Sequence, residues 1–115
     1  VKSTLKYIKD NHSIALMIDQ RVSEGKRLLF FEHMALTTTL PSQLAVKYHL
    51  DIVPIYISRN ENDDFKMKVY EPIKNLNNKN SEINKLDLTI NLNKILEQMI
   101  QKDPGQWIWT HNRWK

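Results

Sequence analysis

The run Ile14-Ala15-Leu16-Met17-Ile18, with Asp19-Gln20 directly after it, carries most of the fold prediction. It is a short apolar run without interruption, and it ends on two polar residues. Such a run is typical of a strand buried on both faces, as in a parallel sheet covered by helices. In open sheets of this kind, ligands bind beyond the carboxyl ends of the strands. We therefore predict that Asp19 and Gln20 lie beside a ligand, although an aspartate in this place can also simply open a turn.

The size and composition indicate one globular domain over residues 1–115. With no cysteine, the chain can form neither a disulfide nor a thiolate metal site. No apolar run is long enough to span a bilayer, and no signal peptide is visible. The net charge of +4 suits nucleic acid, anionic lipid or an acidic carrier protein, and does not choose among them. Because the sequence starts at Val1 rather than at methionine, we expect a fragment of a longer protein.

Hydrophobic spacing along the rest of the chain predicts three helices and three further strands. Helices are expected at residues 4–11, at 41–49, and from a cap at Asp87 to the stop at Asp103-Pro104-Gly105. Strands are expected at 28–31, at 52–58, and at 65–70, where apolar and polar residues alternate. The last two are joined by a short turn and are expected to form a hairpin, with pairing beginning after Pro54. Residues 32–40 and 72–85 are expected to be loops.

The order strand, helix, strand between residues 14 and 58 implies a crossover between parallel strands. The predicted fold class is therefore α/β, with a mixed, mostly parallel sheet flanked by helices. In a parallel sheet, Asp19 and Gln20 would share one edge with Arg59, which follows the later strand. A carboxylate, an amide and a guanidinium would converge there, and arginine suits phosphate or carboxylate groups. The alternative is a purely structural ion pair between Asp19 and Arg59.

Other kinds of site receive little support. The four histidines match no zinc-binding spacing, and two isolated glycines cannot form a phosphate-binding loop. We therefore expect no metal and no cofactor. No nucleophile-elbow motif is present either. The three threonines at 37–39 either line a pocket or satisfy backbone groups in the predicted loop.

The tail at residues 106–115 holds all three tryptophans, interleaved with His111, Arg113 and Lys115. Such a tail could stack on bases, which makes a small basic nucleic-acid-binding module the alternative function. It could also lie at a membrane interface. We expect at least one tryptophan to pack back on the domain, because exposing all three would be costly.

A series of short blocks follows a recognisable order, and the last of them is the ending from Pro104 to Lys115. The earlier blocks are Ile18-Asp19-Gln20, Phe30-Phe31, Ala35-Leu36-Thr37-Thr38, Gln43-Leu44-Ala45, and Ile52-Val53-Pro54-Ile55 with Arg59. Together they resemble the late acyltransferases of lipid A biosynthesis, the lauroyl or myristoyl acyltransferases of Gram-negative bacteria. The resemblance covers nearly the whole chain.

This resemblance implies part of a glycerolipid-acyltransferase-like fold and an enzyme that moves a fatty acyl chain. The implied donor is the thioester of acyl carrier protein, and the implied acceptor is a hydroxyl of a lipid A precursor. The full-length enzyme would work at the cytoplasmic face of the inner membrane, whereas the fragment would be soluble. The partners would thus be the carrier protein, the lipid precursor and the membrane surface, with no nucleic acid. An isolated fragment is also expected to form homo-oligomers or to be marginally stable, since it would leave apolar surface open.

The catalytic motif of that family is a histidine followed, after four residues, by an acidic residue, and it is absent here. The fifth residue after His12 is Met17, after His33 it is Thr38, and after His49 it is Pro54. The resemblance therefore implies that the chain is the C-terminal fragment of a longer acyltransferase, and we expect no catalytic residue within the fragment. The family also usually has glycine after the Phe-Phe pair, where this chain has Glu32.

The same resemblance assigns substrate binding to several residues of this chain. Asp19-Gln20 stands where related glycerolipid acyltransferases carry a substrate-binding block. We also expect Arg59 and Arg21 to face a lipid phosphate, with Asp19 either holding an acceptor hydroxyl or fixing one of the arginines.

Overall fold

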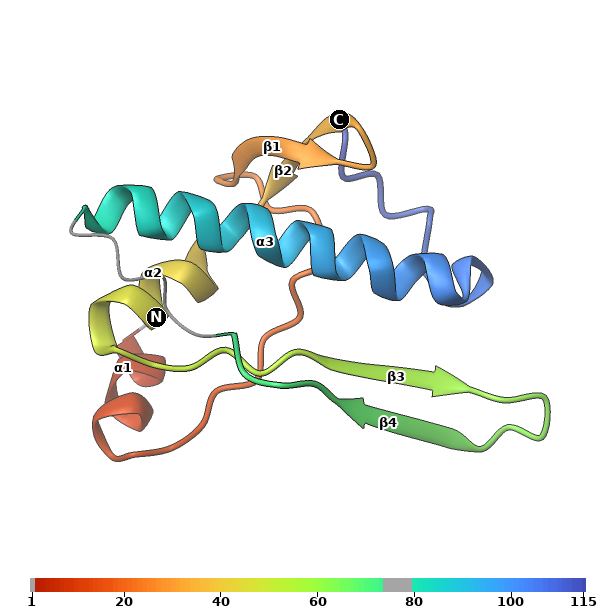
Figure 1. Ribbon diagram of the computed structural model, residues 1–115, viewed down its shortest axis with the longest axis horizontal. Coiled ribbons are helices and arrows are strands. Elements are labelled where there is room, and N and C mark those ends of the chain that lie inside the picture. The colour runs from red at the N-terminus through yellow and green to blue at the C-terminus, as the bar shows by residue number, and fades with distance from the viewer. Residues whose placement is uncertain (1, 74–79) are drawn as a thin grey trace.

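The computed structural model describes residues 2–73 and 80–115 of the chain. Its elements, in chain order, are α1 (Lys2–Lys9), β1 (Lys26–Phe30), β2 (His33–Thr37), α2 (Leu40–Tyr48), β3 (Ile55–Arg59), β4 (Phe65–Val69), α3 (Ser81–Lys102) and the short 3₁₀ helix η1 (Pro104–Gln106). Helix α3 crosses the middle of the molecule, with the β1–β2 hairpin on one side of it and the β3–β4 hairpin on the other (Figure 1).

The predicted mostly parallel sheet is wrong. The described residues contain two separate sheets, each of two antiparallel strands, β1–β2 and β3–β4. Residues 14–18, expected as a central strand, form neither helix nor strand. Ala15, Leu16 and Met17 are exposed, Met17 to 86%. An apolar run becomes a buried strand only where neighbouring strands and covering helices enclose it, and the described part of the chain supplies neither for this run.

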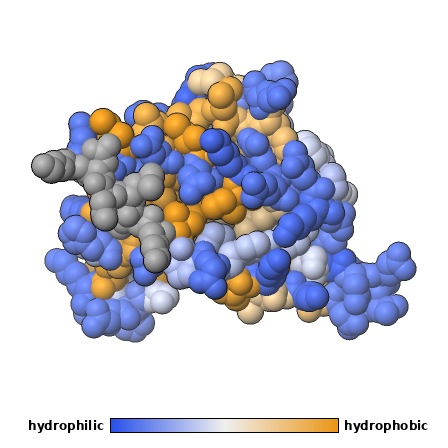
Figure 2. Space-filling view, in the orientation of Figure 1, coloured by the Kyte–Doolittle hydropathy of each residue, from blue (hydrophilic) through white to orange (hydrophobic). Residues whose placement is uncertain are grey.

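The hairpin predicted after Pro54 is confirmed. Strands β3 and β4 pair in a register that sets Ile57 opposite Met67 and Arg59 opposite Phe65. Pairing begins after Pro54, whose carbonyl oxygen accepts the N–H of Tyr70 at 3.0 Å. One face of this hairpin is apolar and exposed, consisting of Ile55, Ile57, Phe65, Met67 and Val69. Its tip forms the hydrophilic cluster at the lower right of Figure 2.

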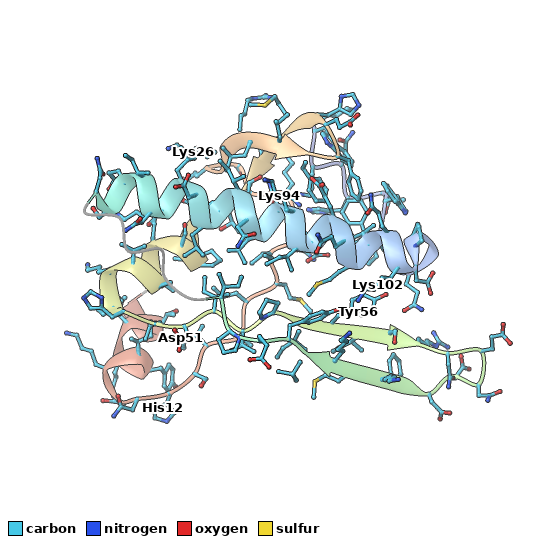
Figure 3. All side chains as sticks on the ribbon, viewed as in Figure 1. His12, Lys26, Asp51, Tyr56, Lys94 and Lys102 are labelled. Atoms are coloured by element: carbon cyan, nitrogen blue, oxygen red, sulfur yellow. The ribbon has the colours of Figure 1, made fainter. Side chains whose placement is uncertain are left out.

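The other face of this hairpin meets the end of α3. The Lys102 ammonium donates a hydrogen bond to the Tyr70 hydroxyl at 2.6 Å and lies 5.9 Å from the centre of the Tyr56 ring. Figure 3 shows Lys102 and Tyr56 next to each other between helix and strand. A lysine and two tyrosines therefore fix the hairpin to the helix, with cation–π attraction adding to the hydrogen bond.

Residues 33–37 were predicted to be loop but form β2, which pairs with β1. The two strands are joined by Phe31 and Glu32, both with positive φ, at 47° and 62°. Two consecutive residues with positive φ form the tight turn that best matches the twist of a hairpin. The pairs Asn-Gly and Asp-Gly usually occupy this type of turn. Because Phe-Glu occupies it here, the hairpin could not be predicted from the sequence.

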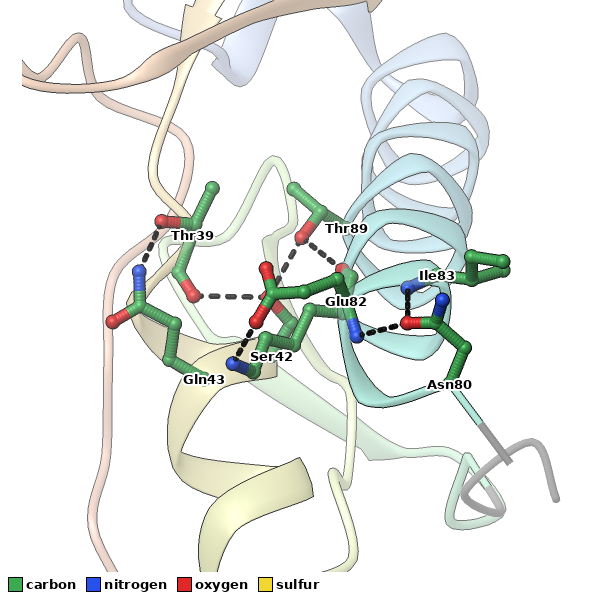
Figure 4. Close-up of polar contacts among 8 residues, drawn as sticks. Thr39, Ser42, Gln43, Asn80, Glu82, Ile83 and Thr89 are labelled. Carbon is green, nitrogen blue, oxygen red and sulfur yellow. Dashed lines mark hydrogen bonds and ion pairs between the residues drawn. The ribbon is translucent and has the colours of Figure 1, made fainter. Parts of the chain in front are cut away.

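Helix α3 begins at Ser81, several residues before the predicted cap at Asp87. The Asn80 side-chain oxygen accepts the N–H groups of Glu82 and Ile83, which caps the helix. Further along, Thr89 contacts Ser42 of α2 through their hydroxyls at 2.7 Å, as Figure 4 shows. The predicted loop at 72–85 therefore ends at Asn80, and its residues 74–79 lie outside the described residues.

The core lies where α3, the β1–β2 hairpin and the tail meet. Its buried centre is Phe30, Ala35 and Ile100, and both Trp107 and Trp114 pack against it. The expectation that at least one tryptophan packs back on the domain is thus confirmed. Trp109 remains half exposed, and its indole N–H donates to the Pro104 carbonyl at 2.7 Å. Two of the three rings are therefore part of the core and do not form a free stacking surface.

Candidate functional site

Asp19, Gln20 and Arg21 lie on a bend beside the tail, after the exposed apolar run. The Arg21 backbone N–H donates to the imidazole Nε2 of His111 at 2.7 Å, which connects the two segments. Asp19 is half buried, whereas Gln20 and Arg21 are exposed. The structure thus connects this predicted site segment, through Arg21, to a residue ninety positions later in the chain.

Arg59 is held elsewhere, at the far end of β3. Its Nη2 and Nε both contact the Asp63 carboxylate, at 2.6 and 2.9 Å. Its backbone N–H and carbonyl bind the Gln106 side-chain amide, at 2.9 and 2.8 Å. Among the described residues no ion pair joins Asp19 to Arg59. The shared sheet edge that was to bring them together does not form, because residues 14–18 are not a strand.

Arg113, in the tail, is a buried charged residue that the sequence reasoning missed. Its exposed fraction is 0%, and its guanidinium lies 4.1 Å from the centre of the Phe30 ring. Its Nη2 donates to Thr37 Oγ1 and Asn93 Oδ1, both at 3.3 Å. Its backbone carbonyl accepts the N–H of Leu36 at 3.1 Å. Arg113 thus joins the tail to β1, β2 and α3.

The polar neighbours of Arg113 form a compact buried network. Asn93 Nδ2 donates to the Leu29 carbonyl at 3.0 Å and to Thr37 Oγ1 at 3.1 Å. Thr37 is itself 3% exposed and Asn93 2% exposed. The sequence signal for such a network was Asn93, a polar residue directly after Leu92 on the buried side of the predicted helix. Buried polar groups of this kind require partners, and an arginine is the partner found here.

Burial and neighbouring charges shift the pKa of Arg113 in opposite directions. Burial lowers the pKa of the Arg113 guanidinium, because a charged group is less stable away from water. The negative charges of Asp19 and Glu97 raise that pKa in the opposite sense. Glu97 is already engaged, since its Oε1 accepts the backbone N–H of Phe31 at 2.8 Å. Within the part of the chain that the structure describes, Arg113 Nε and Nη1 have no hydrogen-bond partner.

A shallow cavity of about 230 Å³ lies next to the predicted site residues. Its walls are Val22, Glu24, Thr38, Thr39, Leu40 and Gln43. The chain passes closely here, because a Cβ on Gly25 would come within 2.8 Å of the Thr37 carbonyl oxygen. Thr38 Oγ1 accepts the N–H of Leu40 at 3.3 Å. Thr39 Oγ1 accepts from the Gln43 amide at 2.7 Å, as drawn in Figure 4. The threonines therefore both line the cavity and satisfy polar groups around it.

Residues 2–73 and 80–115 contain neither a cluster of metal ligands nor a membrane-spanning helix. No three histidine or acidic side chains gather there in a way that could hold a metal ion. None of the helices in those ranges has the length and apolar character needed to cross a bilayer.

The comparisons with known proteins decide the family. The model of the family described as bacterial lipid A biosynthesis acyltransferase matches residues 1–115, the whole chain. The chain belongs to this family. A search of curated proteins finds no match. The blocks that suggested the family now have places in the fold of this family member: Phe30-Phe31 closes the β1–β2 hairpin, and Trp107, Arg113 and Trp114 of the ending tie the tail to the core.

Its function is accordingly of the acyltransferase type, in lipid A biosynthesis. The resemblance drawn from the sequence leads us to expect glycine directly after Phe-Phe. Glu32 has a φ of 62°, in the left-handed region where glycine is favoured because it has no Cβ. The departure from the family pattern keeps the turn and adds a steric cost.

Proposed function

We propose that this chain serves the transfer of a fatty acyl group from acyl carrier protein to a hydroxyl of a lipid A precursor. The observation that carries the proposal is the family match over the whole chain. In the reaction, the acceptor hydroxyl oxygen bonds to the thioester carbonyl carbon and the carbon–sulfur bond breaks. The hydroxyl proton passes to a general base, and the carrier thiolate leaves and takes up a proton.

We assign acceptor binding, rather than proton transfer, to the residues of this chain. His12, His33 and His49 have no acidic residue five positions later, so we assign the base to residues outside these 115. The carboxylate of Asp19 would accept a hydrogen bond from the acceptor hydroxyl. Gln20 and Arg21 are exposed beside it, and Arg21 would meet a lipid phosphate.

Arg59 would serve as a second, separate contact for the lipid. It is exposed at the end of β3, and its pairing with Asp63 keeps its guanidinium ordered. The net charge of +4 would favour both an acidic carrier protein and an anionic lipid surface. In this proposal the whole protein works on the cytoplasmic face of the inner membrane of Gram-negative bacteria.

The test compares the 115-residue chain with the whole protein that contains it. Each is incubated with acyl carrier protein thioester and lipid A precursor, and acylated product is measured. We expect product from the whole protein only. Turnover by the isolated chain that depends on one of its histidines would overturn the assignment of the base.

A second arm replaces Asp19 by asparagine in the whole protein, which keeps the shape and removes the charge. The loss of one charged hydrogen bond is worth roughly 1.5–3 kcal/mol, which corresponds to about one to two decades in rate. The matched control is Asp51→Asn, at an exposed carboxylate between α2 and β3. Turnover that falls further than the folded fraction does at the assay temperature supports the site. Wild-type turnover would make Asp19 a turn residue.

A further inference from the structure

The buried guanidinium of Arg113 is incompletely compensated by its own hydrogen bonds. Both bonds of Nη2 are long, at 3.3 Å, and Nε and Nη1 have no partner among the described residues. The Phe30 ring covers the guanidinium, and the residue has no exposed surface. A buried positive charge of this kind is costly unless a negative charge lies near it. The local structure therefore calls for a carboxylate.

Asp19 and Glu97 are the two carboxylates whose negative charge raises the pKa of Arg113 and so favours its charged form. Glu97 accepts a hydrogen bond from the Phe31 N–H and so already holds the turn between β1 and β2. Asp19 is half buried, and its segment is connected to the tail only two residues before Arg113, through Arg21 and His111. Asp19 and Arg113 do not form an ion pair within 4.0 Å, but charges attract over longer distances where protein rather than water lies between them.

We propose that Arg113 is a positioning residue that acts through Asp19, fixing the direction of the Asp19 carboxylate toward the acceptor. The proposal rests on the proposed function, in which Asp19 binds the acceptor hydroxyl. In this proposal, one carboxylate oxygen would face the guanidinium and the other would remain for the hydroxyl. Through Thr37 and Asn93, the guanidinium is itself held by β2 and α3. The direction of Asp19 is thus set by the most rigid part of the molecule.

The first experiment measures coupling between the two side chains by thermal melting of the full chain. The variants are Asp19→Asn, Arg113→Gln and the double variant. Glutamine removes the charge and keeps donors for Thr37 and Asn93. We expect Asp19→Asn to lower Tm by roughly 5 °C when Arg113 is present, and to change it little when Arg113 is Gln. An equal drop in both backgrounds would overturn the proposal.

Two matched controls sharpen the result. Glu97→Gln in the same cycle tests the other carboxylate, and stronger coupling to Glu97 than to Asp19 would refute the choice of Asp19. The exposed pair Arg59–Asp63 should show almost no coupling, as surface pairs rarely do. Should Arg113→Gln fail to fold, Arg113→Lys takes its place. Lysine keeps the charge, so Asp19→Asn must then still lower Tm; if it does not, the charge is not what joins the two residues.

The second experiment measures acyl transfer by the whole protein that contains the chain. We expect Arg113→Gln to raise KM for the lipid acceptor about tenfold and to leave KM for the carrier thioester unchanged. Asp19→Asn should do the same, with no further rise in the double variant. A merely structural Arg113 would instead lower kcat in proportion to the folded fraction, and that result would overturn the proposal. Coupling in Tm without any effect of Asp19→Asn on KM would refute the proposed function but retain the pairing.

Discussion

The indole N–H of Trp114 donates a hydrogen bond to the backbone carbonyl of Phe30 at 3.2 Å, and the two rings stack at 5.7 Å. The tail is thereby joined to the last residue of β1. The same Phe30 ring receives the guanidinium of Arg113 and the edge of Trp107. Phe30, which is fully buried, is thus the residue on which the tail closes.

Truncation of Trp114 should therefore cost much of the stability of the chain. Trp114→Ala removes the stacked ring and the hydrogen bond, and such losses typically amount to about 3–5 kcal/mol. Trp114→Phe keeps a ring and loses the hydrogen bond, so the expected loss is smaller, about 1 kcal/mol. Urea unfolding followed by fluorescence measures both. Trp109→Ala, at a half-exposed ring, is the control, and an equal loss there would contradict this view of the tail.

Glu32→Gly should stabilise the chain. The left-handed conformation costs a residue with a Cβ roughly 1–2 kcal/mol, and glycine escapes this cost while losing more backbone entropy on folding. We expect a net rise in Tm of a few degrees in a thermal melt. Glu61→Gly is the matched control, since Glu61 is also an exposed turn glutamate but is not among the positive-φ residues. A fall in Tm for Glu32→Gly would mean that the Glu32 side chain contributes more than the turn costs.

Thr89→Val should loosen the contact between α2 and α3. The Thr89 hydroxyl lies 2.7 Å from Ser42 Oγ and 2.7 Å from the Lys85 carbonyl, and it is almost fully buried. Valine keeps the shape and leaves Ser42 without this partner, at an expected cost of about 1–2 kcal/mol. Thr110→Val, at an exposed threonine, should be neutral. A double variant with Ser42→Ala should lose less than the sum of the single variants, and additivity would argue against a shared bond.

The apolar face of the β3–β4 hairpin should make the isolated chain self-associate. Ile57 and Met67 form a cross-strand pair, exposed to 56% and 63%, in the middle of that face. Contiguous apolar patches of this kind favour association in water. Sedimentation at increasing concentration should show dimers or larger species, and Ile57→Lys should return the chain toward monomer. Lys66→Gln, on the opposite face, should change nothing; a wild-type chain that stays monomeric would refute the prediction.

The elements that could be predicted from the sequence are those that depend on residues close to one another in the chain. The β3–β4 hairpin follows from alternation and a short turn, and the body of α3 from its apolar spacing. Residues 14–18 were misjudged because burial on both faces depends on strands distant in the sequence, and apolar character alone does not supply them. Strand β2 was missed because its turn uses Phe31 and Glu32 in place of glycine.

In the candidate site, too, some residues could be predicted from the sequence and one could not. Asp19, Gln20 and Arg21 could be chosen from the sequence because they end an apolar run. Arg113 could not, since arginine is rarely buried and the tail was judged by its tryptophans. Its burial depends on Thr37 and Asn93, which are separated from it by 76 and 20 positions. A residue that owes its environment to such distant partners leaves little trace in its own neighbourhood.

The bond between Trp114 and Phe30 spans 84 positions of the chain. A ribosome that adds about 5–20 residues per second needs roughly 4–17 s to proceed from one to the other. During that interval the β1–β2 hairpin is already synthesised, but the rings that will cover it are not. The nascent chain must therefore carry an uncovered aromatic turn for seconds, in which chaperones and wrong partners compete with a tail that has yet to be made.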